Sequence, residues 1–453
     1  MNNNFNLLRE KYPTIKYSKY DFKTFNDKLI ITYTFEIPNL TTFKPSIQIP
    51  LKNQTISLTD PLLNNLIFHI GVVELISYFK CTCSPNIIIE AGYLNEEQIK
   101  WFKKLYYLGL GEFLYVNDIK ITDDELLNIK CTAKKRTFSI PKYEGFGNLI
   151  PIGGGKDSCV TLELLKDFQK DNNCFIINPK PVMIECTKIA NYSEDQCIFV
   201  NRTIDKNLIE LNKKGFLNGH TPFSAIVAFT SFLTAYIHKK RYITLSNEAS
   251  ANESTVLGTK INHQYSKTYE FENDFNYYTK KYFGINISYF SLLRPLNEFQ
   301  IAKLFSQYEK YHQTFKSCNV GSKEKIWHWC CECPKCLFVF SILSPYLYKE
   351  KLVNIFTEDL FEKKELLSTF LELLGYSKNK PFECVGTYSE VRYAISLTIK
   401  HQTEKLPFLL QYYKENFPLE LEHNFENSFN NEHNLPKQYE EIIKKEIKKW
   451  NKK

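Results

Sequence analysis

The sequence lacks an apolar run long enough to cross a bilayer. Its longest apolar stretches, Leu62–Phe79 and Cys336–Leu347, are interrupted by polar residues or by a proline, whereas a membrane-spanning helix needs about 20 consecutive apolar residues. Residues 1–4 (MNNN) provide no basic start for a secretory signal, and no apolar segment follows them. We therefore expect a cytoplasmic protein that has no membrane partner.

The sequence also lacks internal repeats, low-complexity linkers and a recognisable RNA-binding motif. Its 453 residues, of which 43% are hydrophobic and 24% are charged, are typical of a soluble protein with two or three domains. Much of the net charge of +8 comes from the lysines of residues 444–453, a run that is typical of a solvated last helical turn. We expect no nucleic-acid partner, and the sequence leaves the oligomeric state open.

Three regions of the chain differ in their pattern. Residues 1–140 mix β-type and helical segments, which predicts an N-terminal α+β domain. Residues 141–347 alternate short apolar strands with amphipathic helices, which predicts an α/β fold with a parallel sheet and helices on both faces. Residues 348–453 are predicted to be mostly helical. Because ligands of such sheets bind beyond the carboxyl ends of the strands, we expect functional residues in the loops that follow them.

The chain contains 13 cysteines, and four of them fall within seven residues. Cys330, Cys333 and Cys336 have the spacing C-x2-C-x2-C, and Cys318 completes a set of four thiolates suited to tetrahedral zinc. Cys331 is an alternative to Cys330, and a cluster of free thiols is the alternative to a metal site. Four thiolates leave no open coordination position, so we expect a structural zinc. Without a secretory signal, this pattern favours a reduced compartment over disulfides.

A glycine-rich turn connects a predicted strand, Leu149–Ile152, with a predicted amphipathic helix. Its sequence is Gly153-Gly154-Gly155-Lys156-Asp157-Ser158. Three glycines let successive backbone N–H groups face one anion, and the helix N-terminus adds partial positive charge. Lys156 supplies a cation, while Asp157 and Ser158 can bind Mg²⁺ or hydrogen-bond to phosphates. The turn is therefore predicted to be a phosphate-binding loop; a glycine-rich turn with no ligand is the alternative.

The spacing of this loop excludes two common nucleotide-binding motifs. A kinase-type P-loop needs a glycine at position 150, where this chain has Ile150, and a Ser or Thr in place of Asp157. A dinucleotide-binding loop needs a third glycine where the chain has Ser158. The loop resembles the PP-loop, Ser-Gly-Gly-x-Asp-Ser, of the N-type ATP pyrophosphatases, with Gly153 in place of the leading serine. This resemblance implies that ATP is cleaved at its α-phosphorus.

The segment GHTP, residues 219–222, precedes a predicted helix. Thr221 is a good N-cap, and Pro222 is a natural first helical residue. We expect a second exposed helix N-terminus at which His220 faces a ligand, with simple capping as the alternative.

The segment SNEASANE, residues 246–253, follows a predicted strand. So many polar side chains at a strand end cannot all be buried without partners. We expect a substrate-binding or magnesium-binding loop with Glu248 as its leading carboxylate, and a solvated loop is the alternative. His263 and Lys267 come shortly afterwards and add a titratable ring and a cation.

Taken together, the motifs resemble the MurL family, the UDP-N-acetyl-α-D-muramoyl-L-alanyl-L-glutamate epimerases. The resemblance rests on their order: IPIGGGKDS (150–158), GHTPFSA (219–225), SNEASANE (246–253), HQYSK (263–267), LLRPL (292–296) and WCCECPKC (329–336). It implies an enzyme that uses ATP and Mg²⁺ and releases AMP and diphosphate. The implied reaction converts the terminal L-Glu of UDP-MurNAc-L-Ala-L-Glu to D-Glu during peptidoglycan synthesis.

Carboxylate adenylation, which the resemblance implies, is a sensible route to epimerisation. The mixed anhydride carries no charge on its acyl group, so its Cα–H is far more acidic than that of a carboxylate, and a positioned base can remove the proton. The candidates for activation and proton transfer are Lys156, Asp157, Cys186, His220, Glu248 and His263. The candidates for substrate binding are Thr221, Asn247, Asn252, Lys267 and Arg294.

Two other classes of function are alternatives. One is another PP-loop adenylating enzyme, of the tRNA-thiolation kind or like 7-cyano-7-deazaguanine synthase, which has a similar cysteine arrangement with different spacing. The first domain shows neither a basic stripe nor an RNA-binding motif, which argues against an enzyme that acts on tRNA. The other alternative is a non-catalytic nucleotide-binding protein, and the intact Lys156, Asp157 and Ser158 argue against it.

Overall fold

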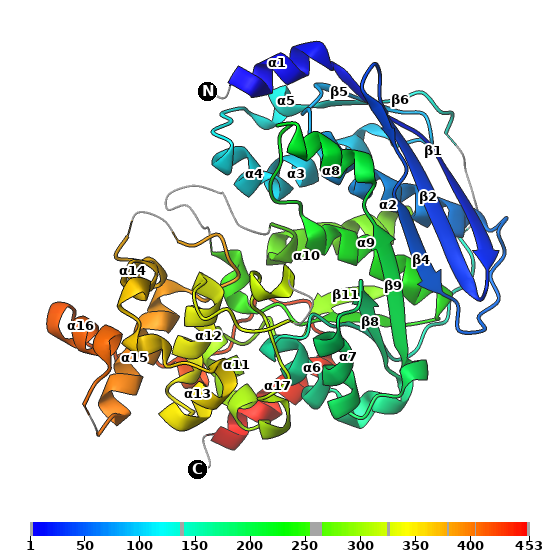
Figure 1. The fold of residues 1–453 in the computed structure, drawn as a ribbon. Helices are drawn as coiled ribbons and strands as arrows, with labels where there is room; N and C mark the ends of the chain where they lie inside the picture. Colours follow the sequence, from blue (N-terminus) through cyan, green and yellow to red (C-terminus); the bar gives the residue numbers. More distant parts are fainter. Residues whose placement is uncertain are drawn as a thin grey trace. The chain divides into compact units, whose positions relative to one another are not determined.

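The computed structural model describes residues 3–135, 140–253, 265–323, 327–377, 380–403 and 405–450 (Figure 1). The described chain contains both helices and strands, so its fold is mixed α/β, as the sequence predicts. Two compact units are present, and each is built from separate segments of the sequence. Unit 1 consists of Met1–Leu149, Ile198–Ile243 and Gln264–Ser288, and unit 2 consists of Ile150–Cys197, Thr244–His263 and Tyr289–Lys453.

The strands of unit 1 are β1 (Thr14–Phe25), β2 (Lys28–Ile37), β3 (Thr41–Phe43), β4 (Ser46–Pro50), β5 (Asn86–Ile89), β6 (Asn128–Cys131) and β9 (Cys197–Thr203). They lie in the order β9-β4-β2-β1-β5-β6, with β3 paired to β2. β1 and β2 are antiparallel, and Asn26 and Asp27 turn the chain between them with φ values of 47° and 54°. Asn and Asp tolerate this left-handed backbone better than most residues.

Helix α2 (Pro61–Phe79) is the core helix of unit 1. Asp60 caps it by accepting a 2.9 Å hydrogen bond from the Leu62 N–H, and Pro61 occupies the first turn, where no donor is needed. The helix packs against α9 (Phe223–Ile237) and β1. Of the described helices, only α2 is long and apolar enough to cross a membrane, but 89% of that stretch is buried. It is therefore an interior helix of the fold.

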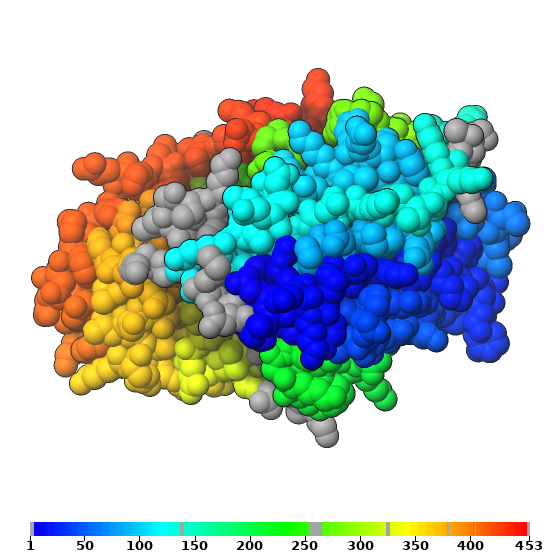
Figure 2. All heavy atoms as spheres, turned by 90° about the horizontal axis from the view of Figure 1, so that it is seen from above, coloured from blue at the N-terminus to red at the C-terminus, as the bar shows by residue number. Residues whose placement is uncertain are grey.

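The N-terminal helix α1 is held to unit 1 by one arginine. Arg9 donates to the carbonyl oxygens of Cys83 and Leu126, both at 2.7 Å, and of Glu125 at 2.8 Å. Figure 2 accordingly shows the dark-blue atoms of the N-terminus against cyan atoms of this region. The remaining helices of unit 1, with α1 first, are α1 (Asn3–Lys11), α3 (Glu96–Gly109), α4 (Gly111–Val116), α5 (Asp123–Leu126), α8 (Lys206–Lys213) and α10 (Tyr269–Tyr282).

A buried histidine on α2 makes unit 1 sensitive to acid. The His69 Nδ1–H donates to the Asn65 carbonyl (2.7 Å), and its Nε2 faces the Gln98 amide nitrogen (3.3 Å), which suits a neutral ring. Burial lowers the pKa of His69 from 6.5 to about 4. The unfolded chain therefore takes up this proton first as the pH falls, and stability is lost between about pH 6.5 and pH 4.

We expect this single group to lower the free energy of unfolding by about 2 kcal/mol between pH 7 and pH 5. Urea-induced unfolding at the two pH values measures the loss. His69→Gln should show a smaller loss than the wild type, whereas His401→Gln, which changes an exposed histidine on another helix, should leave the loss unchanged. Equal pH dependence in all three proteins would contradict the prediction.

Four short strands remain, and three of them carry the chain from unit 1 into unit 2. They are β7 (Asn148–Pro151), β8 (Asn173–Ile177), β10 (Tyr242–Leu245) and β11 (Ser288–Ser291), in the order β11-β10-β7-β8. β7 and β10 are parallel. β7, β10 and β11 begin in unit 1 and end in unit 2, so the loops that follow their carboxyl ends belong to unit 2.

Unit 2 is mostly helical. Its helices are α6 (Lys156–Leu164), α7 (Pro181–Ile189), α11 (Glu298–Ser306), α12 (Pro334–Leu343), α13 (Lys349–Phe356), α14 (Leu367–Leu374), α15 (Tyr388–His401), α16 (Phe408–Asn416) and α17 (Lys437–Trp450). α11 packs against α6, and α12 packs against both α11 and α15. In the described part of residues 348–450, every regular element is helical.

Candidate active site

The glycine-rich loop lies between β7 and α6, as the sequence predicts. Gly154 has a φ of 80°, and a Cβ added there would lie 3.2 Å from Val182 Cγ1, so both backbone and space require glycine. The Gly153 N–H donates to Ser158 Oγ at 3.0 Å and closes the loop. Gly155 is the N-cap of α6 and provides no side-chain cap. An uncapped helix N-terminus beside a glycine loop is suited to binding an anion.

Lys156, the first residue of α6, is a buried cation. Its side chain is 2% exposed and is ion-paired with Asp157 and Glu298. Burial opposes its charge, but the carboxylates of Asp157 and Glu298, with that of Glu248, raise its pKa, so it remains protonated. Burial in turn raises the pKa of Glu298, and the Lys156 ammonium opposes this shift by favouring the carboxylate. The loop thus places one ammonium group among three carboxylates.

Glu298 is a site residue that reasoning from the sequence missed. It is 1% exposed and stands at the first position of α11. Its N–H donates to the Glu390 carboxylate at 2.7 Å, which also caps α15 through Thr387. The only local signal was the capping box formed by Asn297 and Gln300, which marks a helix start but says nothing of an ion pair with Lys156.

The C-terminal region holds the start of α11 in place. Asn297 donates to the Phe425 carbonyl (2.9 Å) and to Ser428 Oγ (2.8 Å). Gln300 donates to the Ser428 carbonyl at 2.8 Å, and the Asn430 N–H donates to the Pro295 carbonyl at 2.9 Å. Residues 425–430 therefore support the turn from which Glu298 reaches Lys156.

The loop after β10 is also fixed by unit 2. Asn247 donates to Ser291 Oγ at 3.1 Å, and the Ser250 hydroxyl donates to Glu248 Oε1 at 3.3 Å. Arg294 is fully buried and donates to the Glu248 carbonyl at 2.8 Å. Its guanidinium thereby supports the backbone of Glu248. The predicted contact of Arg294 with substrate stays a prediction.

Other predicted residues of unit 2 have varied surroundings. Cys186 is fully buried, with its Sγ 3.8 Å from the Gly154 carbonyl, so it lies against the loop backbone. Asn252 ends a short 3-10 turn, Ala249–Asn252, and the next residue, Glu253, is ion-paired with Lys380. His263 lies outside the described residues.

Unit 1 contains the predicted residues His220, Thr221 and Lys267. Helix α9 begins at Phe223, and its N-cap is Pro222, with no side-chain cap. The prediction that Thr221 caps this helix is therefore wrong. Its hydroxyl instead accepts a 2.7 Å hydrogen bond from Lys80, a residue 141 positions earlier.

The same lysine fixes the segment around His220. Lys80 also donates to the Gly219 carbonyl, and its burial lowers its pKa to about 8. His220 Nδ1 lies 3.4 Å from Glu112 Oε2, an arrangement in which a carboxylate orients an imidazole. Lys267 ends a short 3-10 turn, Tyr265–Lys267, just before Thr268, which caps α10.

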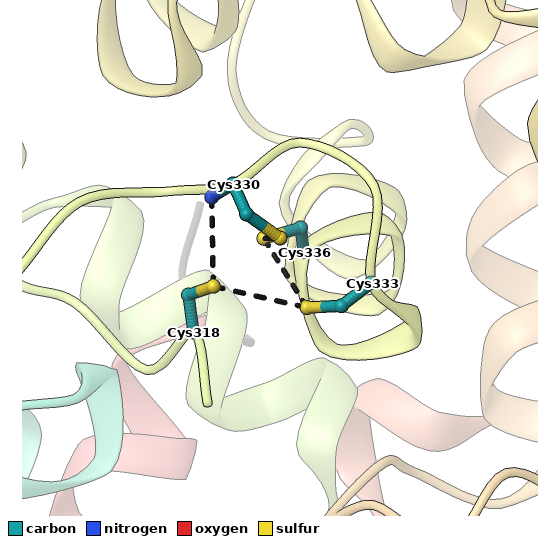
Figure 3. A group of neighbouring side chains, drawn as sticks. All are labelled: Cys318, Cys330, Cys333 and Cys336. Atoms are coloured by element: carbon teal, nitrogen blue, oxygen red, sulfur yellow. Dashed lines mark hydrogen bonds between the residues drawn. The ribbon is translucent and has the colours of Figure 1, made fainter. Parts of the chain in front are cut away.

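Four cysteines converge in unit 2 as the sequence predicts. The sulfurs of Cys318, Cys330, Cys333 and Cys336 all lie within 4.8 Å of one another, and Figure 3 shows them turned toward a common centre. The Sγ–Sγ distances are 3.8 Å for 318–333, 3.8 Å for 330–336 and 3.5 Å for 333–336. Tetrahedral zinc with Zn–S bonds of about 2.3 Å places its sulfurs about 3.8 Å apart. The cluster can hold a structural metal such as zinc.

The structure also shows which of Cys330 and Cys331 belongs to the cluster. Cys331 has a φ of 59°, and its Sγ donates to the Phe356 carbonyl at 2.8 Å, away from the four sulfurs. Burial raises the pKa of Cys331 to about 11, which keeps it a thiol. Cys330 is therefore the fourth member of the cluster.

Comparison with known proteins identifies the family of this chain. The family model described as the MurL N-terminal domain matches residues 7–292, and the model described as the MurL C-terminal domain matches residues 314–428. A relative from a Micromonospora species, named UDP-N-acetyl-alpha-D-muramoyl-L-alanyl-L-glutamate epimerase, is 33% identical over 365 residues, covering 78% of this chain and 79% of the relative. A protein of the same name from Xanthomonas oryzae pv. oryzae is 33% identical over 328 residues, covering 71% and 72%. No solved structure matches. This chain belongs to the MurL family.

Proposed function

We propose that this protein converts the terminal L-Glu of UDP-MurNAc-L-Ala-L-Glu to D-Glu in peptidoglycan synthesis, with ATP as the activating reagent. The observation that carries the proposal is the loop at residues 153–158, with its uncapped helix N-terminus and Lys156, in a chain of the MurL family. The name of its relatives supports the substrate and the epimerisation. The PP-loop resemblance supports the use of ATP.

The proposed activation transfers an adenylyl group. A carboxylate oxygen of the terminal glutamate attacks the α-phosphorus of ATP, the bond from this phosphorus to the bridging oxygen breaks, and diphosphate leaves. The α-proton of the acyl adenylate then moves to a base, and a proton returns to the opposite face of Cα. Water finally cleaves the anhydride and releases the D-Glu product with AMP.

The residues of unit 2 fit the first of these steps. The N–H groups at the start of α6 and the Lys156 ammonium would hold the departing diphosphate. Asp157, whose side chain is 27% exposed, is the proposed ligand of a magnesium ion, which would neutralise phosphate charge. We also assign a structural zinc to the cluster of Cys318, Cys330, Cys333 and Cys336.

Proton transfer is assigned to a small set of residues. His220, paired with Glu112, Glu248 and His263 are the proposed acids and bases. Cys186, whose thiol is fully buried, is a further proposed member of this set. Thr221, Asn247, Asn252 and Lys267 stay proposed substrate-binding residues, and Arg294 is proposed to support Glu248.

The test is incubation with ATP, Mg²⁺ and UDP-MurNAc-L-Ala-L-Glu, followed by acid hydrolysis of the dipeptidyl nucleotide and chiral analysis of its glutamate. We expect D-Glu together with AMP, and a reaction in D₂O should place deuterium at Cα, because the proposed route breaks the Cα–H bond. AMP should not form at a comparable rate when the dipeptidyl nucleotide is left out.

Asp157→Ala serves as the inactive control, and Asp167→Ala, which changes an exposed carboxylate after the same helix, serves as the active one. Absence of both D-Glu and AMP in the wild type would contradict the proposed function. Normal turnover by Asp157→Ala would show that the phosphate loop is assigned to the wrong residues. Retention of RNA at physiological salt would instead favour an enzyme that acts on tRNA.

A further inference from the structure

A second segment of unit 2 lies against the phosphate loop. The Lys316 N–H donates to the Gly154 carbonyl at 3.0 Å. A Cβ added to Gly155 would lie 3.4 Å from Ser317 Cβ, so the side chain of Ser317 packs directly beside the N-cap of α6. Neither residue belongs to a motif that pointed to phosphate binding, and they stand about 160 positions from the loop in sequence.

The hydroxyl of Ser317 is buried without a hydrogen-bond partner among the described residues. A buried hydroxyl that stays unsatisfied costs free energy, so such groups normally bond to protein, water or a ligand. Here the neighbouring groups are the start of α6, where no side chain caps the N–H donors. Ser317 Cβ would lie 3.4 Å from a Cβ on Gly155, the N-cap of α6, and a hydroxyl so close to uncapped backbone N–H groups is suited to join them in holding phosphate oxygens.

The cysteine cluster determines where Ser317 stands. The next residue, Cys318, belongs to the cluster, and its Sγ accepts hydrogen bonds from the N–H groups of Gly321 (3.1 Å) and Cys330 (3.5 Å). On the other side of the loop, Lys180 donates to the Ser322 carbonyl and precedes α7, whose Val182 contacts the Gly154 position. The segment 316–322 is thereby tied to the loop from two directions.

We propose that Ser317 is a phosphate-binding residue of the nucleotide site and that the cysteine cluster holds it against Gly154 and Gly155. The ligand is the diphosphate portion of a nucleoside triphosphate, so this inference rests on the proposed function. In this proposal the cluster does more than stabilise the fold. It also positions the segment 316–322 against the glycine-rich loop.

Calorimetric titration with magnesium diphosphate tests the role of the hydroxyl. We expect Ser317→Ala to bind about 10-fold or more weakly than the wild type, the effect of one lost hydrogen bond to a charged group, with unchanged zinc content and unfolding temperature. Ser322→Ala is the matched control, because that hydroxyl bonds within its own segment to the Asn319 carbonyl. Equal affinity in Ser317→Ala and the wild type would overturn the inference and identify the partner of Ser317 as water.

The role of the cluster is tested by the zinc affinity, measured at equilibrium in competition with a chromophoric chelator. Because coupling between two binding sites is reciprocal, saturating magnesium diphosphate should raise the zinc affinity of the wild type several-fold over that in a control in which diphosphate and chelator compete for zinc without protein. The same concentration should raise the zinc affinity of Ser317→Ala less. Equal zinc affinities with and without diphosphate would refute the coupling. A wild-type protein that binds neither ATP nor diphosphate would refute the proposed function itself. This outcome differs from failure of the inference about Ser317, in which the wild type still binds diphosphate.

Discussion

Lys156→Met is expected to lower ATP-dependent AMP formation by about 10²–10³-fold, the usual effect of removing one group that stabilises developing charge on a leaving group. Lys156 is the cation of the proposed phosphate loop, and it is held by an ion pair with the buried Glu298 and another with the partly exposed Asp157. Methionine has a similar length and no charge, so the variant removes the charge with little change in packing. AMP release from ATP and the dipeptidyl nucleotide measures the effect.

The same substitution is expected to cost about 3 kcal/mol of stability, because it leaves the buried Glu298 carboxylate without its cation. The double variant Lys156→Met with Glu298→Gln replaces both charges by neutral groups, so most of that stability should return. Its activity should stay low. This pattern separates the catalytic need for the ammonium from its contribution to folding.

Lys166→Met provides the matched control, because it removes an exposed lysine just after the same helix. It should keep wild-type activity and stability. Full activity of Lys156→Met would contradict the assigned role, and so would recovery of activity in the double variant, which would mean that only the unpaired carboxylate had been harmful.

Cys333→Ser is expected to release the zinc that native mass spectrometry should detect at about one ion per chain. The sulfur of Cys333 lies 3.8 Å from that of Cys318 and 3.5 Å from that of Cys336, so its loss removes one ligand of the four. In small domains that fold around structural zinc, the binding of the metal contributes an apparent ~10–16 kcal/mol to the free energy of folding. Unit 2 has a core of its own, so a smaller loss, a fall of several degrees in unfolding temperature, is expected.

Cys331→Ser is the control that the chain itself offers. In the wild type the Cys331 sulfur donates a hydrogen bond to the Phe356 carbonyl and lies apart from the four clustered sulfurs, so the zinc content of this variant should not change. Retention of zinc by Cys333→Ser, or its loss from Cys331→Ser, would show that the assignment of ligands is wrong.

Local patterns correctly predicted the structure of the glycine-rich loop and the convergence of the four cysteines. The strand, glycine turn and helix at residues 148–164 follow from neighbours in sequence, because glycines and a helix start act over a few residues. The cysteine spacing likewise predicted the cluster, since three of its members come from one short segment. The helical character of the chain after residue 348 is visible from its apolar periodicity.

The predictions that failed or remained open depended on distant residues. Thr221 was predicted to cap a helix, but its hydroxyl accepts a hydrogen bond from Lys80, which lies 141 positions away in the sequence. The ion pair between Glu298 and Lys156 joins residues that are 142 positions apart, and no local sequence pattern predicts this ion pair. The choice between Cys330 and Cys331 depended on a left-handed backbone at Cys331, which neither the composition nor the spacing of the segment predicts.

The sequence by itself predicted the glycine-rich loop between a strand and a helix and the four-cysteine cluster, and it indicated the MurL family, because these features reside in short segments whose chemistry is local. The tertiary structure alone decided which charges surround Lys156, that Arg294 supports a loop from inside, and that Ser317 packs beside Gly155. The physical reason is that burial and ion pairing depend on which distant segments are packed together, and this packing is a property of the whole folded chain.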